Sequence, residues 1–74
     1  MGIWWAAMTL RLNGDVRECR EGTTVAALVE ELGLGNKRIA VEVNRDIIPR
    51  DEYANCGLQQ DDEVEIVHFV GGGR

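Results

Sequence analysis

Side chains that act as nucleophiles or bind metals are scarce in this chain. Its 74 residues include one histidine, two cysteines and no serine, so His68 has no partner for a nucleophile–base pair. Cys19 and Cys56 lack the CxxC or Cys/His spacing of a metal site, and we interpret them as reduced thiols. The run Asp61-Asp62-Glu63 has no further ligand near it in the sequence and indicates a solvated turn. These patterns predict no catalytic residue, no metal site and no bound cofactor.

The carboxyl end, HFVGGGR, has a different kind of chemistry available to it. Gly71 to Gly73 directly follow an apolar, strand-like run. Three glycines can extend about 10 Å, and without Cβ atoms they fit a slot too narrow for other residues. Fixing them costs roughly 1–2 kcal/mol or more per residue, so only a partner should hold them in place. The alternative is an ordinary frayed terminus. The pattern favours a tail that presents a carboxylate to the active site of another protein.

Such a carboxylate must be activated before it can donate an acyl group. Adenylation with ATP in the partner enzyme is the simplest route. We therefore expect a protein cosubstrate and not an enzyme.

The charge of the chain favours a protein partner over a nucleic acid. Affinity for nucleic acid comes mainly from clustered Lys and Arg side chains. Here the formal net charge is −5, and the seven arginines and one lysine are scattered singly. We expect no nucleic-acid partner, and a protein with a basic or apolar docking surface fits better.

The first strands form a predicted hairpin. Apolar residues alternate with polar ones (Met8, Leu10, Leu12), which is typical of a half-buried strand. Asn13-Gly14 then supplies the positive φ values of a two-residue turn. Counting outward along the return strand, residues 16–20, places Cys19 opposite Met8, so we interpret Cys19 as a small core residue.

One helix of useful length follows. Thr23 or Thr24 can cap it, and Gly33 and Gly35 end it. Its apolar residues fall on one stripe (Val25, Leu28, Val29, Leu32).

The second half of the chain predicts three more extended segments. Residues 39–43 alternate as a strand, and 47–48 form a short edge piece before Pro49. Arg50 to Tyr53 can make one irregular helical turn before the loop at 54–60. The run VEIVHFV is almost wholly apolar, and we predict that it is the central strand.

These elements predict an α+β fold, a mixed sheet of four or five strands with one main helix across one face. We expect a domain over residues 8–70, a flexible extension at 1–7 and a flexible Gly-rich tail at 71–74. Residues 1–7 lack the features of a secretory signal. We expect a cytoplasmic protein with no membrane attachment, monomeric when alone.

Four segments in order make the sequence resemble a known family. They are LRLNG, EGTTVAALVEELGL, VEVNRDIIPRDEY and DDEVEIVHFVGGG. Together they are similar to the ThiS family of thiamine-biosynthesis sulfur carriers, in the ubiquitin-like β-grasp superfamily. The resemblance covers residues 8–73, and VNRDIIPRDEY is its discriminating stretch.

The resemblance implies a mechanism and partners. An adenylating, E1-like enzyme of the ThiF type would convert the carboxylate of Gly73 to an acyl-adenylate, with Gly72 completing the glycine pair. Sulfur from a donor such as a cysteine desulfurase would displace AMP and leave a thiocarboxylate. Thiazole synthase would then take that sulfur.

Arg74 departs from the family pattern, because family members generally end on glycine. If Gly73 carries the sulfur, Arg74 has to be absent; it is then trimmed off, or it does not belong to the natural chain. A third possibility is a family member that no longer carries sulfur.

Docking is expected on the outer face of the last strand, at Val67, Phe69, Val70 and Gly71. The alternation leaves open whether Phe69 lies on that face or in the core. Two other functions are considered: the sulfur-carrier subunit of molybdopterin synthase, and a ubiquitin-like binding or protein-modifying module that carries no sulfur.

Overall fold

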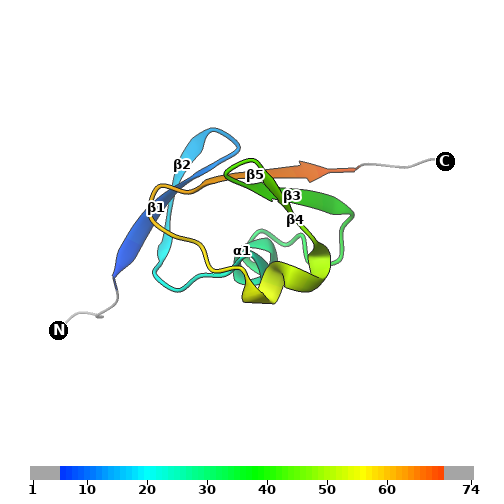
Figure 1. Ribbon diagram of the computed structural model, residues 1–74, viewed down its shortest axis with the longest axis horizontal. Helices are drawn as coiled ribbons and strands as arrows, with labels where there is room; N and C mark the ends of the chain where they lie inside the picture. The colour runs from blue at the N-terminus through cyan, green and yellow to red at the C-terminus, as the bar shows by residue number, and fades with distance from the viewer. Residues whose placement is uncertain (1–5, 70–74) are drawn as a thin grey trace.

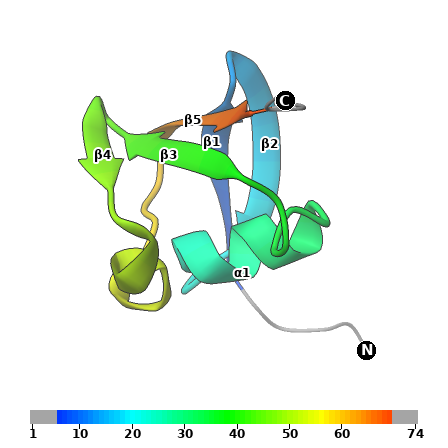
Figure 2. The same ribbon diagram turned by 90° about the vertical axis from the view of Figure 1, so that its right-hand side faces the viewer.

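Residues 6–69, which the computed structural model describes, form a five-stranded mixed sheet with one α-helix packed on one face (Figures 1 and 2). The elements in chain order are β1 (Ala7–Leu12), β2 (Asp15–Arg20), α1 (Val25–Glu31), β3 (Ile39–Val43), β4 (Asp46–Ile48), the 3-10 helix η1 (Arg50–Asn55) and β5 (Glu63–His68). The strand order is β2-β1-β5-β3-β4, so the last strand is central, as predicted. The predicted fold class is confirmed.

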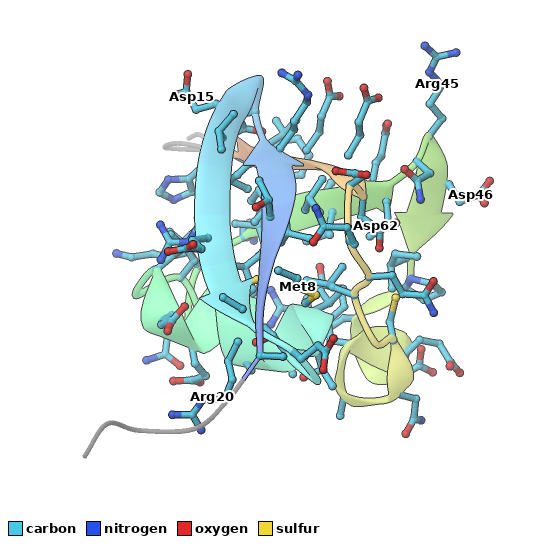
Figure 3. All side chains as sticks on the ribbon, turned by 90° about the vertical axis from the view of Figure 1, so that its left-hand side faces the viewer. Met8, Asp15, Arg20, Arg45, Asp46 and Asp62 are labelled. Atoms are coloured by element: carbon cyan, nitrogen blue, oxygen red, sulfur yellow. The ribbon has the colours of Figure 1, made fainter. Side chains whose placement is uncertain are left out.

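The β1–β2 hairpin has the register expected from its turn. Asn13 and Gly14 have φ values of 51° and 88°, which a two-residue turn with left-handed residues requires. Met8 pairs with Cys19, and both side chains face the helix side of the sheet. Met8 is buried, and Figure 3 shows it pointing into the interior. The strand begins at Ala7, one residue before the alternating pattern starts.

Caps at both ends fix the length of α1. The Thr24 hydroxyl accepts a 3.1 Å hydrogen bond from the backbone N–H of Ala27, so Thr24 is the cap and Thr23 is not. At the other end Gly33 has a φ of 75°, and its N–H donates to the carbonyl of Glu30. The N–H of Leu34 donates to the carbonyl of Val29, which completes a Schellman motif. The motif turns Leu34 back toward the core.

The core lies between α1 and the inner face of the sheet. It consists of eleven buried apolar side chains: Met8, Leu10, Val25, Leu28, Val29, Val41, Val43, Tyr53, Leu58, Val64 and Ile66. No buried polar or charged residue is found within residues 6–69. Packing of apolar surface therefore supplies most of the stability.

Arg50 ties η1 to the loop before β3. Its guanidinium donates hydrogen bonds to the carbonyls of Lys37, at 2.8 Å, and Gly35, at 3.4 Å. It also lies 5.5 Å from the centre of the Tyr53 ring, within cation–π range. The helical turn predicted for residues 50–53 extends to Asn55. Arg50 therefore shapes this corner of the fold.

Candidate functional site

Strand β5 is bonded differently on its two sides. The N–H of Phe69 donates to the carbonyl of Arg38, and the N–H of Asn44 donates to the carbonyl of Glu63, so odd-numbered residues of this strand bond toward β3. Even-numbered residues bond the other way: the carbonyl of Val64 accepts from Asn13 of the hairpin turn. The strand that leads to the carboxyl end is thus held from both sides over its first half.

The side chain of Asn13 extends the contact between the hairpin and β5. Its Oδ1 accepts a 2.8 Å hydrogen bond from the N–H of Ile66, and its Nδ2 donates to the carbonyl of Ile66 at 3.3 Å. The amide thus takes the place of one more backbone residue in the ladder. The sequence marked Asn13 as a turn residue and gave no signal for this second role.

Asn44 plays a matching role at the start of β5. Its Oδ1 accepts from the N–H of Glu63 at 3.0 Å, and its Nδ2 donates to the carboxylate of Asp62 at 2.9 Å. Asn44 has a φ of 51° in the β3–β4 turn, where it precedes Arg45, whose φ is 75°. The sequence carries no local signal for this link to β5.

The outer face of β5 is apolar near its carboxyl end. Val67 is 53% exposed and Phe69 is 54% exposed. Val67 lies opposite Ala40 of β3, on the face away from the helix. Phe69 is therefore on the predicted docking face and not in the core.

The same face becomes acidic toward the start of β5. Glu65 lies opposite Glu42 of β3, and Glu63 follows on the same side. Together with Arg45 these side chains line an open hollow of about 310 Å³. Figure 3 shows Arg45 pointing away from the body of the molecule. Arg11 of β1 pairs with Glu63 on this face as well. The outer face around β5 thus combines a small apolar area with three carboxylates and two guanidiniums.

The remaining predicted site residues lie outside the described part of the chain. These residues are Val70, Gly71, Gly72, Gly73 and Arg74. Residues 1–5 of the N-terminal extension also lie outside the described part. The structure brings the exposed docking residues to the end of β5, immediately before this segment. Figure 1 shows that end of the strand at the side of the molecule away from the start of β1.

Both cysteines are half-buried free thiols. Burial is the main cause that raises the pKa of the Cys19 thiol, and the same holds for the pKa of Cys56. A raised pKa keeps a thiol protonated and unreactive near neutral pH. Within residues 6–69 there is no group of three or more metal-ligating side chains placed to hold an ion, and no helix there is long and apolar enough to cross a membrane.

Comparison with known proteins identifies the family. The model of the ThiS family matches residues 10–73, which is most of the chain. The chain belongs to the ThiS family. A ThiS crystal structure from Geobacter metallireducens superimposes with a TM-score of 0.76 at 28% identity, over 89% of this chain and 100% of that one. The resemblance inferred from the four sequence segments is confirmed.

The relatives that this chain matches include two kinds of named protein, sulfur carriers and thiazole synthases. The sulfur carrier protein ThiS of Bacillus subtilis is 43% identical over 65 residues, which are 86% of this chain and 98% of the relative. A protein of Magnetococcus marinus named thiazole synthase is 40% identical over 67 residues, 90% of this chain and 21% of the relative. The chain thus spans about a fifth of the thiazole synthases that it matches.

Proposed function

We propose that this protein is a sulfur carrier of thiamine biosynthesis. The observation that carries the proposal is the family match, which runs through residue 73 and so includes the glycines of the carboxyl end. Sulfur carrier proteins of similar length in the family support it. The protein acts as a cosubstrate of its partner enzymes and not as a catalyst.

In the proposed reaction the carboxylate of Gly73, which is free only in a chain without Arg74, attacks the α-phosphate of ATP in an adenylating, E1-like enzyme of the ThiF type. The products are the acyl-adenylate and pyrophosphate. A sulfur nucleophile, such as a persulfide made by a cysteine desulfurase, then displaces AMP and forms an acyl persulfide. A second thiol attacks its S–S bond at the donor's sulfur, which releases the thiocarboxylate and leaves that thiol in a disulfide with the donor cysteine. Gly72 completes the glycine pair that enters the active site, since residues without Cβ atoms pass a narrow slot.

Partner docking is proposed to use the outer face of the sheet. Val67 and Phe69 form its exposed apolar centre, and Glu42, Glu63 and Glu65 lie beside them. A complementary partner presents an apolar patch next to basic side chains. Val70 and Gly71 continue this contact toward the tail.

Thiazole synthase is the proposed acceptor of the sulfur. Relatives named thiazole synthase contain a segment similar to nearly the whole of this chain, which supports a partnership between the two activities. The free thiols fit a reducing compartment, and we place the protein in the cytoplasm as a monomer.

The decisive experiment uses two chains, one ending at Gly73 and one retaining Arg74. Each is incubated with the adenylating enzyme, ATP and a sulfur source and then weighed by mass spectrometry. The chain ending at Gly73 should gain the mass difference between sulfur and oxygen, and the longer chain should not. The absence of that gain with an enzyme that thiocarboxylates a known carrier would refute the proposal.

Deletion of the gene separates the remaining alternatives. Thiamine auxotrophy is expected, whereas loss of molybdoenzyme activity would indicate the molybdopterin pathway. If a chain lacking residues 72–74 complements the deletion, the protein is a binding or modifying module without sulfur transfer.

A further inference from the structure

The second half of β5 has a strand neighbour on only one side. The backbone N–H and C=O of His68 point away from β3, because only the odd-numbered residues of β5 bond in that direction. On the other side β1 ends at Leu12, and the hairpin turn reaches no further than Ile66 through the Asn13 side chain. Figure 1 shows β5 continuing past the hairpin with β3 alongside it. Among residues 6–69, no strand pairs with this edge at His68.

An apolar hollow lies next to the open edge. Its apolar lining comes from the end of β1, the end of α1 and β5, with Asn13 and His68 as its polar residues. The four apolar lining residues are Leu12, Leu32, Leu34 and Ile66. The volume is about 290 Å³, just below the range of small-molecule sites, roughly 300–1,000 Å³. It suits one inserted side chain better than a cofactor.

The position of the hollow is built into the fold. The Schellman motif brings Leu34 back toward the core, and the hairpin register puts Leu12 on the helix side of the sheet. Val67 and Phe69 point to the opposite face, so this hollow is separate from the docking face of the proposed function.

We propose that an extended segment of thiazole synthase adds as a strand to β5 at His68 and inserts one apolar side chain into this hollow. Two features select such an occupant. An unpaired N–H and C=O on an extended backbone are matched by the backbone of another strand, and alternate side chains of that strand then point to one face. An apolar hollow beside the edge selects an apolar residue at that position.

The position of His68 close to the tail indicates which protein supplies the added strand. His68 precedes the first tail glycine by three residues in the sequence, so a strand bound here belongs to the protein that takes up the tail. Relatives named thiazole synthase include a segment similar to this chain, which favours that enzyme. The inference therefore rests on the proposed function.

Hydrogen exchange of the unaltered chain provides the first test. The amide of His68 is followed with and without the thiazole synthase encoded in the same genome, and with the adenylating enzyme instead. Exchange at His68 should slow at least tenfold with thiazole synthase. Unchanged exchange in a demonstrated complex, or protection by the adenylating enzyme alone, would overturn the inference.

Substitution of His68 tests the backbone contact. H68P removes the N–H that points away from β3, while the β3–β5 bonds through Val67 and Phe69 remain, as is usual for proline at a sheet edge. H68A removes the imidazole but keeps the N–H and is the matched control. H68P should bind thiazole synthase about tenfold more weakly than H68A. Equal binding by the two would contradict the proposal, and if H68P does not fold, hydrogen exchange decides alone.

Substitution in the hollow tests the inserted side chain. L34D places a carboxylate on its wall, whereas V16D adds the same charge at an exposed valine of β2 outside the hollow. L34D should weaken binding at least tenfold with its circular dichroism spectrum retained, and V16D should not. Equal binding by both variants would refute the apolar insertion.

Thiocarboxylate formation separates the two proposals. If the chain ending at Gly73 gains sulfur but His68 shows no protection, only the strand addition fails. If no sulfur is gained with an active enzyme, the carrier function fails first.

Discussion

Two asparagines with left-handed backbones connect the turns of the sheet to its central strand. Asn13 and Asn44 both have a φ of 51°, a conformation that asparagine adopts more readily than most residues. Each then uses its amide to bond the backbone of β5, at Ile66 and Glu63. A glycine would satisfy the backbone of either turn but would not make these bonds.

The contribution of Asn13 can be measured with an isosteric change. N13D keeps the tolerance of a positive φ but replaces the Nδ2 donor by a carboxylate oxygen facing the carbonyl of Ile66. We expect a loss of about 1–3 kcal/mol in the free energy of unfolding, measured with urea. N36D makes the same charge change in an exposed loop and should lose less than about 0.5 kcal/mol. Equal losses in both variants would show that the bridge adds nothing.

The two cysteines give a prediction about pH. Burial raises the pKa of Cys19 and the pKa of Cys56, so at a given pH the folded chain holds less thiolate than the unfolded chain. Alkylation by iodoacetamide at pH 7.5 should therefore be slower in the folded protein than in urea. The rate in the folded protein should rise at higher pH than in the unfolded protein. Equal rates with and without urea would contradict the raised pKa values.

At the scale of elements, α1 is short and depends on its caps. It runs for seven residues, and an isolated helix of this length is not stable in water. The Thr24 cap, the Schellman motif at Gly33 and three buried side chains hold it in place. Gly35 was predicted as a second terminating residue, but only Gly33 of the two has a positive φ.

Removal of the cap should be measurable in the whole protein. T24A leaves the N–H of Ala27 without its hydroxyl acceptor, and we expect a loss of about 1 kcal/mol in the free energy of unfolding. T24S keeps the hydroxyl and should lose less. The urea midpoints of both variants provide the measurement, and a T24A midpoint equal to that of T24S would exclude the cap as a stabilising contact.

Elements with a local signal in the sequence were predicted correctly. Features that depend on contacts with residues distant in the sequence were not predicted. The Asn13-Gly14 turn fixes the hairpin register by counting alone, and the α1 stripe fixes which side faces the core. The face of Phe69 could not be predicted, because VEIVHFV is apolar on both sides near its end. His68 occupies an inner-face position at the rim, where the core no longer demands an apolar residue.

At the scale of the whole molecule, charge is distributed unevenly. The net charge is −5, and carboxylates of β3 and β5 lie together on the sheet face opposite α1. Such a field accelerates the encounter with a basic surface and weakens as salt is added.

The rate of association with the adenylating enzyme should therefore depend on salt. We expect the double variant E42Q/E65Q to associate about threefold to tenfold more slowly than the unaltered chain at low salt and to differ little at high salt. Stopped-flow kinetics measure both rates. E52Q, on η1, is the control and should behave like the unaltered chain. A double variant as fast as this control at low salt would exclude steering by the sheet face.

The arrangement of the strands in space could be predicted from the sequence only in part. The hairpin, the central position of the last strand and the helix on one face follow from patterns in the sequence. The open edge at His68 does not, because it depends on how far the hairpin extends beside β5, and that is set by a parallel pairing of only two residue pairs, Arg11 with Glu63 and Leu12 with Val64.

The parallel arrangement of β1 and β5 has a mechanical consequence. A pull on residue 69 against residue 6 acts along both strands in opposite directions. The hydrogen bonds from Arg11 to Asp62 and from Asn13 to Val64 and Ile66 lie across that line and must break together instead of opening one after another. The sheet therefore behaves as a shear clamp, and an enzyme that draws on the carboxyl end can exert force on it while the domain stays folded.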